Sequence, residues 1–405
     1  MSVASMKILM GSSYFSSHLG GVELVAGMLF KEFSVLGHEI VWMAGDITPP
    51  PEAAGKSRTA SLRIFNFVED KTGIPFPVPS LKALKMIVRE VRNADVLVLH
   101  DCLYLGNIFA FLAAKWTRIP TVIIQHVGFI PYRSVIPNLI LRLGNAVVTR
   151  PMLSRASQVV FVGEVTRKYF DDVGFTSPPR VIFNGVDAET FCPLTQSETI
   201  QQLRREFGLP EDGVVILFVG RFVERKGITA LMRMAEERPD WTWAFAGWGT
   251  FDPNQRNLSN IRVFSSLPTP SLARLYRCCS LFVLPSSGEG GFPLVAREAL
   301  ASGLPVVCGR ESLDADPSME NFAAAAPVYP DDDERTAREF LSEIDRVLTS
   351  EAESGSKAEA RRRFVVSRSS WRSVAEQHLE LISHVVTGEK LSPPRSEQSS
   401  QGVQG

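Results

Sequence analysis

The sequence predicts an α/β protein built from two tandem Rossmann-like domains, each a doubly wound parallel sheet. The chain has 405 residues, which is too long for one ordinary hydrophobic core and suits two domains of about 150–200 residues. Its 45% hydrophobic and 21% charged residues are typical of a globular protein. Short apolar, β-branched runs alternate with longer segments of helical period, and this alternation indicates βαβ units.

The first series of elements fills a predicted domain at residues 1–185. Its strands are predicted at residues 6–11, 39–45, 62–67, 95–100, 120–126 and 158–163. The clearest helix is predicted at residues 21–37, where apolar residues recur every three or four positions until Gly37 ends the pattern.

The second series fills a predicted domain at residues 186–368, after a junction at Asn184 to Pro193. Its strands are predicted at residues 214–220, 241–247, 261–266, 280–286 and 304–309. A helix at residues 369–387 follows the second series, and we expect it to return to the first domain. Residues 388–405 are rich in Pro, Ser and Gln, which predicts a disordered tail.

Charge and cysteine content narrow the class of protein. The net charge is −1, yet residues 1–183 carry 19 Lys and Arg against 13 Asp and Glu, and the remainder carries 24 against 31. Near neutrality and the lack of a DNA- or RNA-reading motif argue against a nucleic-acid partner. The five cysteines show no CxxC spacing, which favours a reducing compartment. With neither a signal-peptide pattern nor an apolar run of about 20 residues, we expect a cytoplasmic protein that does not cross a membrane.

Ligands of open α/β sheets bind outside the carboxyl ends of the strands, so the loops that follow the strands are the first places to inspect. Arg221 and Lys226 follow the strand predicted at residues 214–220. An arginine and a lysine beside a glycine turn suit a diphosphate, because Arg binds it through two nitrogens and Lys adds a point charge. Taken alone, the two residues are equally consistent with ordinary surface charges at a helix start.

A second phosphate-binding device is predicted after residues 280–286. Gly288, Gly290 and Gly291 permit close backbone approach, and a helix begins near Pro293. The amino end of that helix offers unpaired N–H groups and a positive dipole end. The carboxylates of Glu289 and Glu298 flank the turn. They could accept hydrogen bonds from sugar hydroxyls, or they could be solvated charges.

These two devices, in this order, resemble the nucleotide-sugar site of retaining glycosyltransferases of the GT-B fold, specifically glycosyltransferase family 4 (glycosyl transferases group 1). The motifs that carry the resemblance are "GR-x4-KG" and "EGGFPLVAREA". It extends to "GVELVAGMLFKEFSVLGHEI", "FNGVDAETFCP" and "AGWGT", and covers roughly residues 6–310.

The resemblance implies a role for each matching residue. The diphosphate would be held by Arg221 and Lys226, and the ribose by Glu298, while the first-domain glycines would close on the donor. His126 would lie near the transferred sugar and the acceptor. The implied donor-binding residues are Gly20, Gly21, Arg221, Lys226, Gly290, Gly291, Phe292, Pro293, Leu294 and Glu298, and the implied catalytic residues are His126, Glu289, Arg221 and Lys226.

One departure from the family pattern concerns the two glutamates. They usually lie eight positions apart, whereas Glu289 and Glu298 are nine apart, and counting back eight from Glu298 reaches Gly290. Either Glu289 takes the first role through a one-residue bulge that glycine accommodates, or the sugar loses that contact.

The implied activity is transfer of a sugar, with retention of configuration, from a nucleoside diphosphate to a hydroxyl of a glycan, lipid-linked or small-molecule acceptor. The resemblance implies neither a cofactor nor a metal, and we expect none. Two alternatives stay open: a GT-B hydrolase or epimerase acting on a nucleotide sugar, and a catalytically silent partner that only binds one. A nicotinamide-dependent oxidoreductase is disfavoured, because no GxGxxG follows a predicted strand.

A basic region at residues 115–155 suggests a further partner. No acidic residue occurs between Asp101 and Glu164, and the interval contains Lys115, Arg118, Arg133, Arg142, Arg150 and Arg155. With apolar runs such as "VIPNLILRLGNAVV" among them, these residues could form an amphipathic surface that touches anionic lipid at the inner membrane face. The alternative is that the apolar residues are core and the arginines are scattered over solvated faces.

Overall fold

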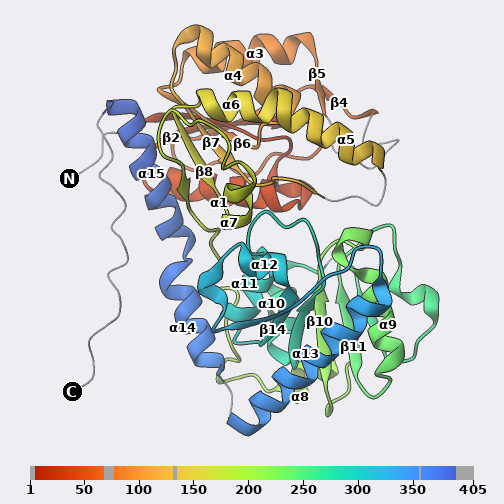
Figure 1. Ribbon diagram of the computed structural model, residues 1–405. Helices are drawn as coiled ribbons and strands as arrows, with labels where there is room; N and C mark the ends of the chain where they lie inside the picture. The colour runs from red at the N-terminus through yellow and green to blue at the C-terminus, as the bar shows by residue number, and fades with distance from the viewer. Residues whose placement is uncertain (1–4, 68–76, 131–134, 266, 355–356, 389–405) are drawn as a thin grey trace, which may run out of the picture.

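The computed structural model describes residues 5–67, 77–130, 135–265, 267–354 and 357–388. Figure 1 shows two α/β units, one above the other, with α14 and α15 running along one side of both. The two units are a seven-stranded sheet with its helices and a six-stranded sheet with its helices. The predicted pair of Rossmann-like units is therefore confirmed.

The N-terminal sheet is parallel throughout, in the order β3-β2-β1-β6-β7-β8-β9. The central strands are buried on both faces because helices cover both sides, which is why they read as continuous apolar runs. Its strands are β1 Lys7–Gly11, β2 Glu39–Gly45, β3 Arg58–Leu62, β6 Val96–His100, β7 Thr121–Gln125, β8 Gln158–Phe161 and β9 Arg180–Val181.

One strand prediction, at residues 62–67, was wrong in its position. The sheet strand β3 ends at Leu62, and the chain then leaves the sheet so that β4 Ile64–Phe65 pairs antiparallel with β5 Val78–Pro79. The prediction followed apolarity, but β3 lies at the sheet edge, where the polar sequence RTASL is tolerated because one side is open. The apolar run beyond Leu62 instead ends in Phe65, which is exposed.

Helices from both ends of the chain cover the N-terminal sheet. On one face, α1 and α15 pack with the sheet into an apolar cluster that contains Phe33, Trp42, Trp371 and Leu379. On the other face lie α3, α4 and α6. The helices of this unit are α1 Gly21–Val35, α3 Leu81–Arg92, α4 Leu105–Thr117, α5 Val135–Gly144, α6 Arg150–Arg155, α7 Glu164–Tyr169 and α15 Trp371–Thr387, with a 3₁₀ turn η1 Ser16–His18 and a π-helical turn η2 Asn145–Thr149.

The C-terminal sheet is also parallel, in the order β12-β11-β10-β13-β14-β15. Its strands are β10 Val215–Val219, β11 Thr242–Ala246, β12 Ile261–Phe264, β13 Leu281–Leu284, β14 Val306–Gly309 and β15 Ala323–Ala326. The sequence interpretation missed β15, because four alanines lack the β-branched side chains that mark a strand. This strand extends the sheet by pairing with β14.

The remaining helices surround the C-terminal sheet. They are α8 Ile200–Glu206, α9 Ile228–Glu237, α10 Thr269–Cys278, α11 Leu294–Ala301, α12 Arg310–Asp314, α13 Asp333–Ser354 and α14 Ala358–Arg368, with 3₁₀ turns η3 Glu224–Lys226, η4 Pro253–Arg256 and η5 Pro317–Met319. No helix in the ranges given above is long and apolar enough to cross a bilayer.

The chain crosses between the units twice, and the two crossings are bonded to each other. The backbone N–H of Val186 donates to Ser369 O at 2.7 Å. Any side chain at Gly185 would place its Cβ 2.6 Å from the Trp371 ring, so only glycine fits there. The helix α15 is thereby held where it can return to the N-terminal unit.

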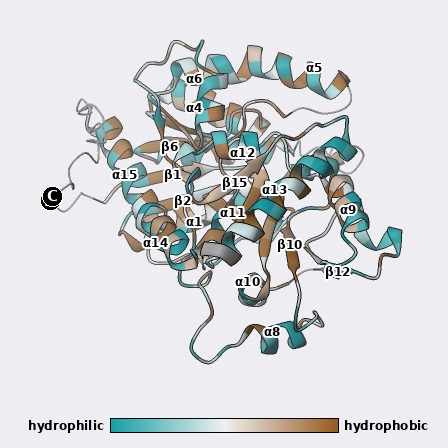
Figure 2. Ribbon diagram, turned by 60° about the horizontal axis from the view of Figure 1, so that its bottom comes forward, coloured by the Kyte–Doolittle hydropathy of each residue, from teal (hydrophilic) through white to brown (hydrophobic). Residues whose placement is uncertain are grey.

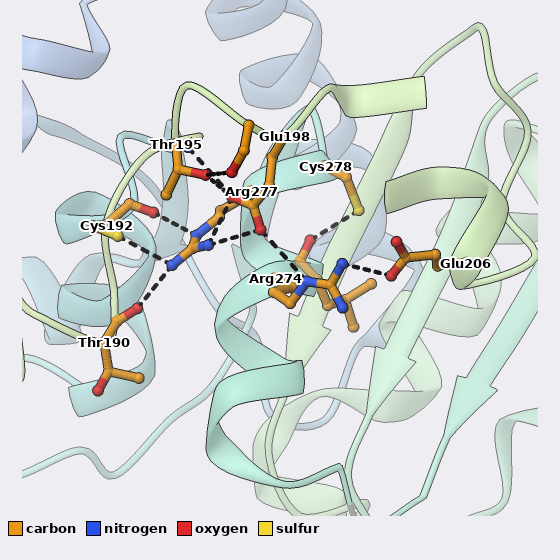
Figure 3. Close-up of polar contacts among 10 residues, drawn as sticks. Thr190, Cys192, Thr195, Glu198, Glu206, Arg274, Arg277 and Cys278 are labelled. Atoms are coloured by element: carbon orange, nitrogen blue, oxygen red, sulfur yellow. Dashed lines mark hydrogen bonds and ion pairs between the residues drawn. The ribbon is translucent and has the colours of Figure 1, made fainter. Parts of the chain in front are cut away.

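Arginine side chains fasten the segment after the first crossing to the C-terminal unit, and Figure 3 shows one of them, Arg277. Arg277 of α10 donates to Thr190 O at 3.2 Å, to Cys192 O at 2.9 Å and to Glu198 Oε2 at 2.8 Å. Beside it, Arg274 pairs with Glu206 at 2.6 Å. These contacts make the segment from Thr190 onward part of the C-terminal unit.

Candidate functional site in the cleft between the two units

A cleft of about 440 Å³ lies between the two units and is lined by both. Strands β7 and β8 on one side and β10 and β13 on the other all end at it, which is where open parallel sheets bind ligands. Among the residues proposed from sequence, the cleft brings together Gly20, Gly21, His126, Arg221, Glu289, Gly290, Gly291, Phe292, Pro293 and Leu294. Lys226 and Glu298 are not among the lining residues, although Lys226 contacts one of them, Glu289.

The cationic side of the cleft is the turn after β10. Arg221 and Arg225 line the cleft, whereas the ammonium group of Lys226 turns to the carboxylate of Glu289 and forms an ion pair with it. Arg225 Nη1 lies 3.9 Å from the same carboxylate. Sequence reasoning missed Arg225, since the family motif skips this position; its only signal was a third cation in the same short turn.

The Lys226–Glu289 pair is mostly shielded from water, with side-chain exposures of 14% and 15%. Burial lowers the pKa of Lys226 from its usual value. Burial alone would raise the pKa of Glu289, but Lys226 and Arg225 outweigh it and the net shift is downward. The carboxylate is therefore ionised at neutral pH.

The glycine loop between β13 and α11 packs against the N-terminal unit. An added Cβ at Gly290 would lie 1.7 Å from His126 O, and one at Gly291 would lie 2.8 Å from Val162 O. The Thr166 hydroxyl donates to Gly290 O at 2.7 Å. The extra residue of the nine-residue spacing is thus accommodated at the contact between units, with Glu289 held by Lys226; its contact with a sugar stays a prediction.

The helix α11 places its amino end at the cleft, because Pro293 caps it and both Pro293 and Leu294 line the cavity. Glu298, one turn further on, is half-buried, and the Tyr276 hydroxyl donates to its Oε2 at 3.2 Å. Burial raises the pKa of Glu298 to about 7, and the nearby carboxylate of Asp187 adds to the rise. This carboxyl group therefore titrates near neutrality.

On the N-terminal unit, Gly20 and Gly21 form the start of α1 at the cleft. Gly20 is the N-cap of α1, and an added Cβ would lie 2.0 Å from the Glu23 carboxylate, which folds back over the cap. Gly21 has no heavy atom within 4 Å of such a Cβ, so its backbone is open to the cleft. Close approach by a ligand is sterically allowed at Gly21.

His126 is held in place by two residues that the sequence interpretation did not single out. Its Nε2 lies 3.0 Å from Nδ1 of His100, and its backbone N–H donates to Asp101 Oδ1 at 2.8 Å. Asp101 adopts the left-handed backbone conformation, with φ at 62°, which is uncommon for a residue with a side chain. The only signal in the sequence was the pair of polar residues at the end of a buried strand.

The electrostatics of this corner keep the imidazole uncharged. Burial, with a smaller contribution from the proximity of His378 in α15, lowers the pKa of His126 to about 3. Burial raises the pKa of Asp101 to about 7. At neutral pH His126 is therefore a neutral imidazole at the cleft wall. Across the ranges that the structure describes, no group of three or more His, Cys, Asp or Glu has the arrangement of a metal site.

Two parallel-sheet α/β units that close on a cleft lined by both have the GT-B architecture of glycosyltransferases. The family model described as "Glycosyltransferase Family 4" matches residues 19–190, and the one described as "Glycosyl transferases group 1" matches residues 199–355. The chain belongs to this glycosyltransferase family, as the sequence motifs indicated.

Known proteins similar to this chain agree with that assignment. The D-inositol 3-phosphate glycosyltransferase of Thermobifida fusca is 32% identical over 33% of this chain, and the alpha-galactosylglucosyldiacylglycerol synthase of Streptococcus pneumoniae is 28% identical over 40% of it. The alignments span only 35% and 46% of those two relatives.

Two solved structures show the same fold over nearly the whole length. Sucrose-phosphate synthase from Thermosynechococcus elongatus has a TM-score of 0.71 at 19% identity and covers 95% of this chain and 100% of its own. Anabaena HepE in complex with UDP and glucose has a TM-score of 0.70 at 18% identity and covers 93% of this chain and 99% of its own.

Proposed function

We propose that this protein transfers a sugar from a nucleoside diphosphate to an acceptor hydroxyl, with retention of anomeric configuration. The observation that carries the proposal is the convergence of two cationic residues, a glycine loop and a helix amino end on one side of the cleft, opposite Gly21 and His126. Retention follows from the family resemblance. The site of action is cytoplasmic, with peripheral contact to the inner membrane face.

The diphosphate of the donor fits the turn after β10 and the amino end of α11. Negative charge grows on the diphosphate as the glycosidic bond breaks, and Arg221 and Arg225 already line the place where it would lie. Preorganised positive groups of this kind stabilise the transition state without reorganisation, and loss of one typically costs about 10²–10³ in rate. We propose that these cations balance the charge and that no metal ion or other cofactor takes part.

The Lys226–Glu289 pair has a direct part in donor binding. When the sugar enters, its hydroxyls would replace the ammonium group as partners of Glu289, and Lys226 would turn to the diphosphate. Lys226 thereby exchanges one anionic partner for another, and Glu289 keeps the Arg225 guanidinium at 3.9 Å beside its new hydroxyl partners. Neither buried charge is left unpaired, which would cost several kcal/mol.

The ribose is the proposed partner of Glu298. Its ionised carboxylate can accept hydrogen bonds from two neighbouring hydroxyls, and Tyr276 orients it. Because its pKa is about 7, donor binding should strengthen as the pH rises through neutrality.

The N-terminal unit is the proposed acceptor side. Neutral His126 can exchange hydrogen bonds with the sugar or the acceptor, while Asp101 and His100 keep it in place. The names of the two sequence relatives mention compounds as different as D-inositol 3-phosphate and a glycosylated diacylglycerol. Donor and acceptor are therefore proposed as classes: a nucleoside-diphosphate sugar, and a glycan, lipid-linked or small-molecule hydroxyl.

The test combines binding and turnover on the purified protein. UDP, GDP, ADP, TDP and NAD, with the common sugar adducts, are compared by thermal shift, since a ligand at about 100 times its Kd adds about 2.7 kcal/mol to the folded state. One diphosphate and its sugar adduct should raise the Tm by several degrees. Transfer is then measured for the wild type and for Arg221→Ala, Lys226→Ala and Glu298→Ala.

Each outcome of this experiment has a distinct meaning. Loss of transfer in all three variants supports the proposal, and near-normal turnover in all three contradicts it. Release of free sugar without transfer indicates a hydrolase. Selective binding without any turnover indicates a catalytically silent binding partner, and a response to NAD alone refutes the whole assignment.

A further inference from the structure

The helix α5 and the turn η2 that continues it present an apolar face to solvent. Six large apolar side chains on this stretch are between 60% and 78% exposed. They are Val135, Ile136, Leu139, Ile140, Leu143 and Val147. Their spacing of three and four residues puts them on one side of the helix. Figures 1 and 2 show α5 at the outer margin of the N-terminal unit.

This pattern is the reverse of an ordinary surface helix, which turns its apolar stripe toward the core. None of the side chains of α5 is buried. The sequence left open whether the apolar residues of this helix belong to the core or to an exposed surface, and the structure places them at the surface. Single exposed apolar residues are common, but a continuous row of this size marks an interaction surface. We name these six residues the α5 face.

The surroundings of the α5 face favour an anionic partner. The interval from residue 102 to residue 163 has no acidic residue. Arg142 is exposed beside the α5 face, and Lys115, Arg118 and Arg155 are exposed on the same unit. Arg150 is different, because it is neutralised by Asp172 at 2.9 Å. Arg133 lies outside the described residues.

The α5 face is also tied to the wall of the cleft. Asn145 of η2 donates to Gly128 O at 2.8 Å, and the Arg142 guanidinium lies 5.2 Å from the centre of the Phe129 ring. Both partners belong to the loop that begins at His126 and lines the cleft as far as Ile130. Since Val135 is five residues beyond Ile130, their Cα atoms are at most about 18 Å apart.

We propose that the α5 face rests in an anionic lipid bilayer and that the acceptor is an amphiphile drawn from that bilayer into the cleft. Exposed apolar side chains beside a cation such as Arg142 suit the boundary between headgroups and acyl chains, where a ten-residue helix lies on the membrane and does not span it. The proposed docking to a bilayer depends only on the exposed α5 face and not on the activity of the protein. The proposed class of acceptor rests on the proposed glycosyl transfer.

The docking is tested by co-sedimentation of the full chain with phosphatidylcholine vesicles, with and without about 30 mol% phosphatidylglycerol. The test variant is the triple substitution Ile136→Ser, Ile140→Ser and Leu143→Ser. The matched control is Val35→Ser, because Val35 is 62% exposed on α1, on the opposite side of the sheet. All proteins are first compared by Tm and by their thermal shift with UDP, which report folding and the donor site separately.

We expect the wild type and the control to bind the anionic vesicles, less strongly at high salt, and the triple variant to bind about tenfold less. On an amphiphilic acceptor in vesicles the triple variant should lose transfer in proportion, with its response to UDP unchanged. Equal sedimentation of the wild type and the triple variant would overturn the docking. So would a dimer, seen by sedimentation velocity, that the triple variant dissociates, since a second copy would then cover the face.

The two proposals fail in different ways. If the wild type binds vesicles through the α5 face but shows no response to any nucleoside diphosphate, the proposed function is wrong and the docking stands. If transfer proceeds equally well on a soluble acceptor and is unaffected by the triple variant, the acceptor class is wrong and the glycosyl transfer stands.

Discussion

Replacing Gly290 by alanine should open the cleft, because this residue sits where the two units touch. The new Cβ would lie 1.7 Å from His126 O and 2.9 Å from the Thr166 hydroxyl oxygen. Ordinary van der Waals contact for a Cβ begins near 3.4 Å. The glycine loop and the N-terminal unit must therefore separate by about the difference of these values, roughly 1.7 Å.

The expected cost of this separation is catalytic and does not come from backbone strain. Gly290 is not among the residues with positive φ, so alanine suits its backbone. A misplacement of about 1 Å between reacting groups can reduce the rate about 10²-fold. We therefore expect kcat/KM for sugar transfer to fall at least about 100-fold, which corresponds to about 2.7 kcal/mol of transition-state stabilisation.

The assay compares steady-state transfer, nucleotide affinity and the radius of gyration by X-ray scattering for Gly290→Ala and a matched control. Gly174→Ala serves as the control, because it meets no atom within 4 Å and has no positive φ. The control should be as active as the wild type and as stable or slightly more so. If Gly290→Ala kept kcat/KM within about threefold of the wild type and the same radius, the inferred contact between loop and strand end would be refuted.

Three further substitutions probe the buried charges. The pKa of Glu298 is raised to about 7 in the folded protein, so between about pH 4.5 and 7 the folded state keeps a proton that the unfolded chain has lost. The free energy of unfolding should therefore fall by about 3 kcal/mol as the pH rises through this range. Urea unfolding of Glu298→Gln should not show that fall. Glu289→Gln removes the anionic acceptor proposed for the sugar hydroxyls and should raise the KM for the donor at least about tenfold, and an unchanged KM would separate Glu289 from donor binding. Arg297→Met should destabilise the fold by about 3–5 kcal/mol, measured by urea unfolding, since it strands the carboxylate of Asp316, whose partner nitrogen lies at 2.5 Å; a loss under about 1 kcal/mol would contradict this.

The parts of the fold that could be predicted from sequence are those with a local cause. Central strands such as β2 and β6 are buried on both faces, so each reads as an apolar run of its own. The edge strands β3 and β15 carry no such signal, because half of their surroundings is missing or made of small residues. Their positions depend on the neighbouring strand that each one pairs with.

The residues of the candidate site also fall into those with a local signal in the sequence and those without one. Arg221 and the glycine loop could be located because the end of a parallel strand, a turn glycine and a helix start are visible in a short stretch of chain. The support of His126 by His100 and Asp101 could not be located in that way. Those residues come from a neighbouring strand, and only the sheet register brings the carboxylate of Asp101 under the backbone of His126.

By itself, the sequence determined two parallel sheets, their central strands, and the loops that carry phosphate-binding chemistry. These follow from apolar runs and turn residues that act within about ten neighbours along the chain. Only the tertiary structure decided that Lys226 pairs with Glu289, that Gly290 meets His126, and that the α5 face points outward. Ion pairing, close contact and exposure depend on which distant segments pack together, and the linear pattern does not specify that packing.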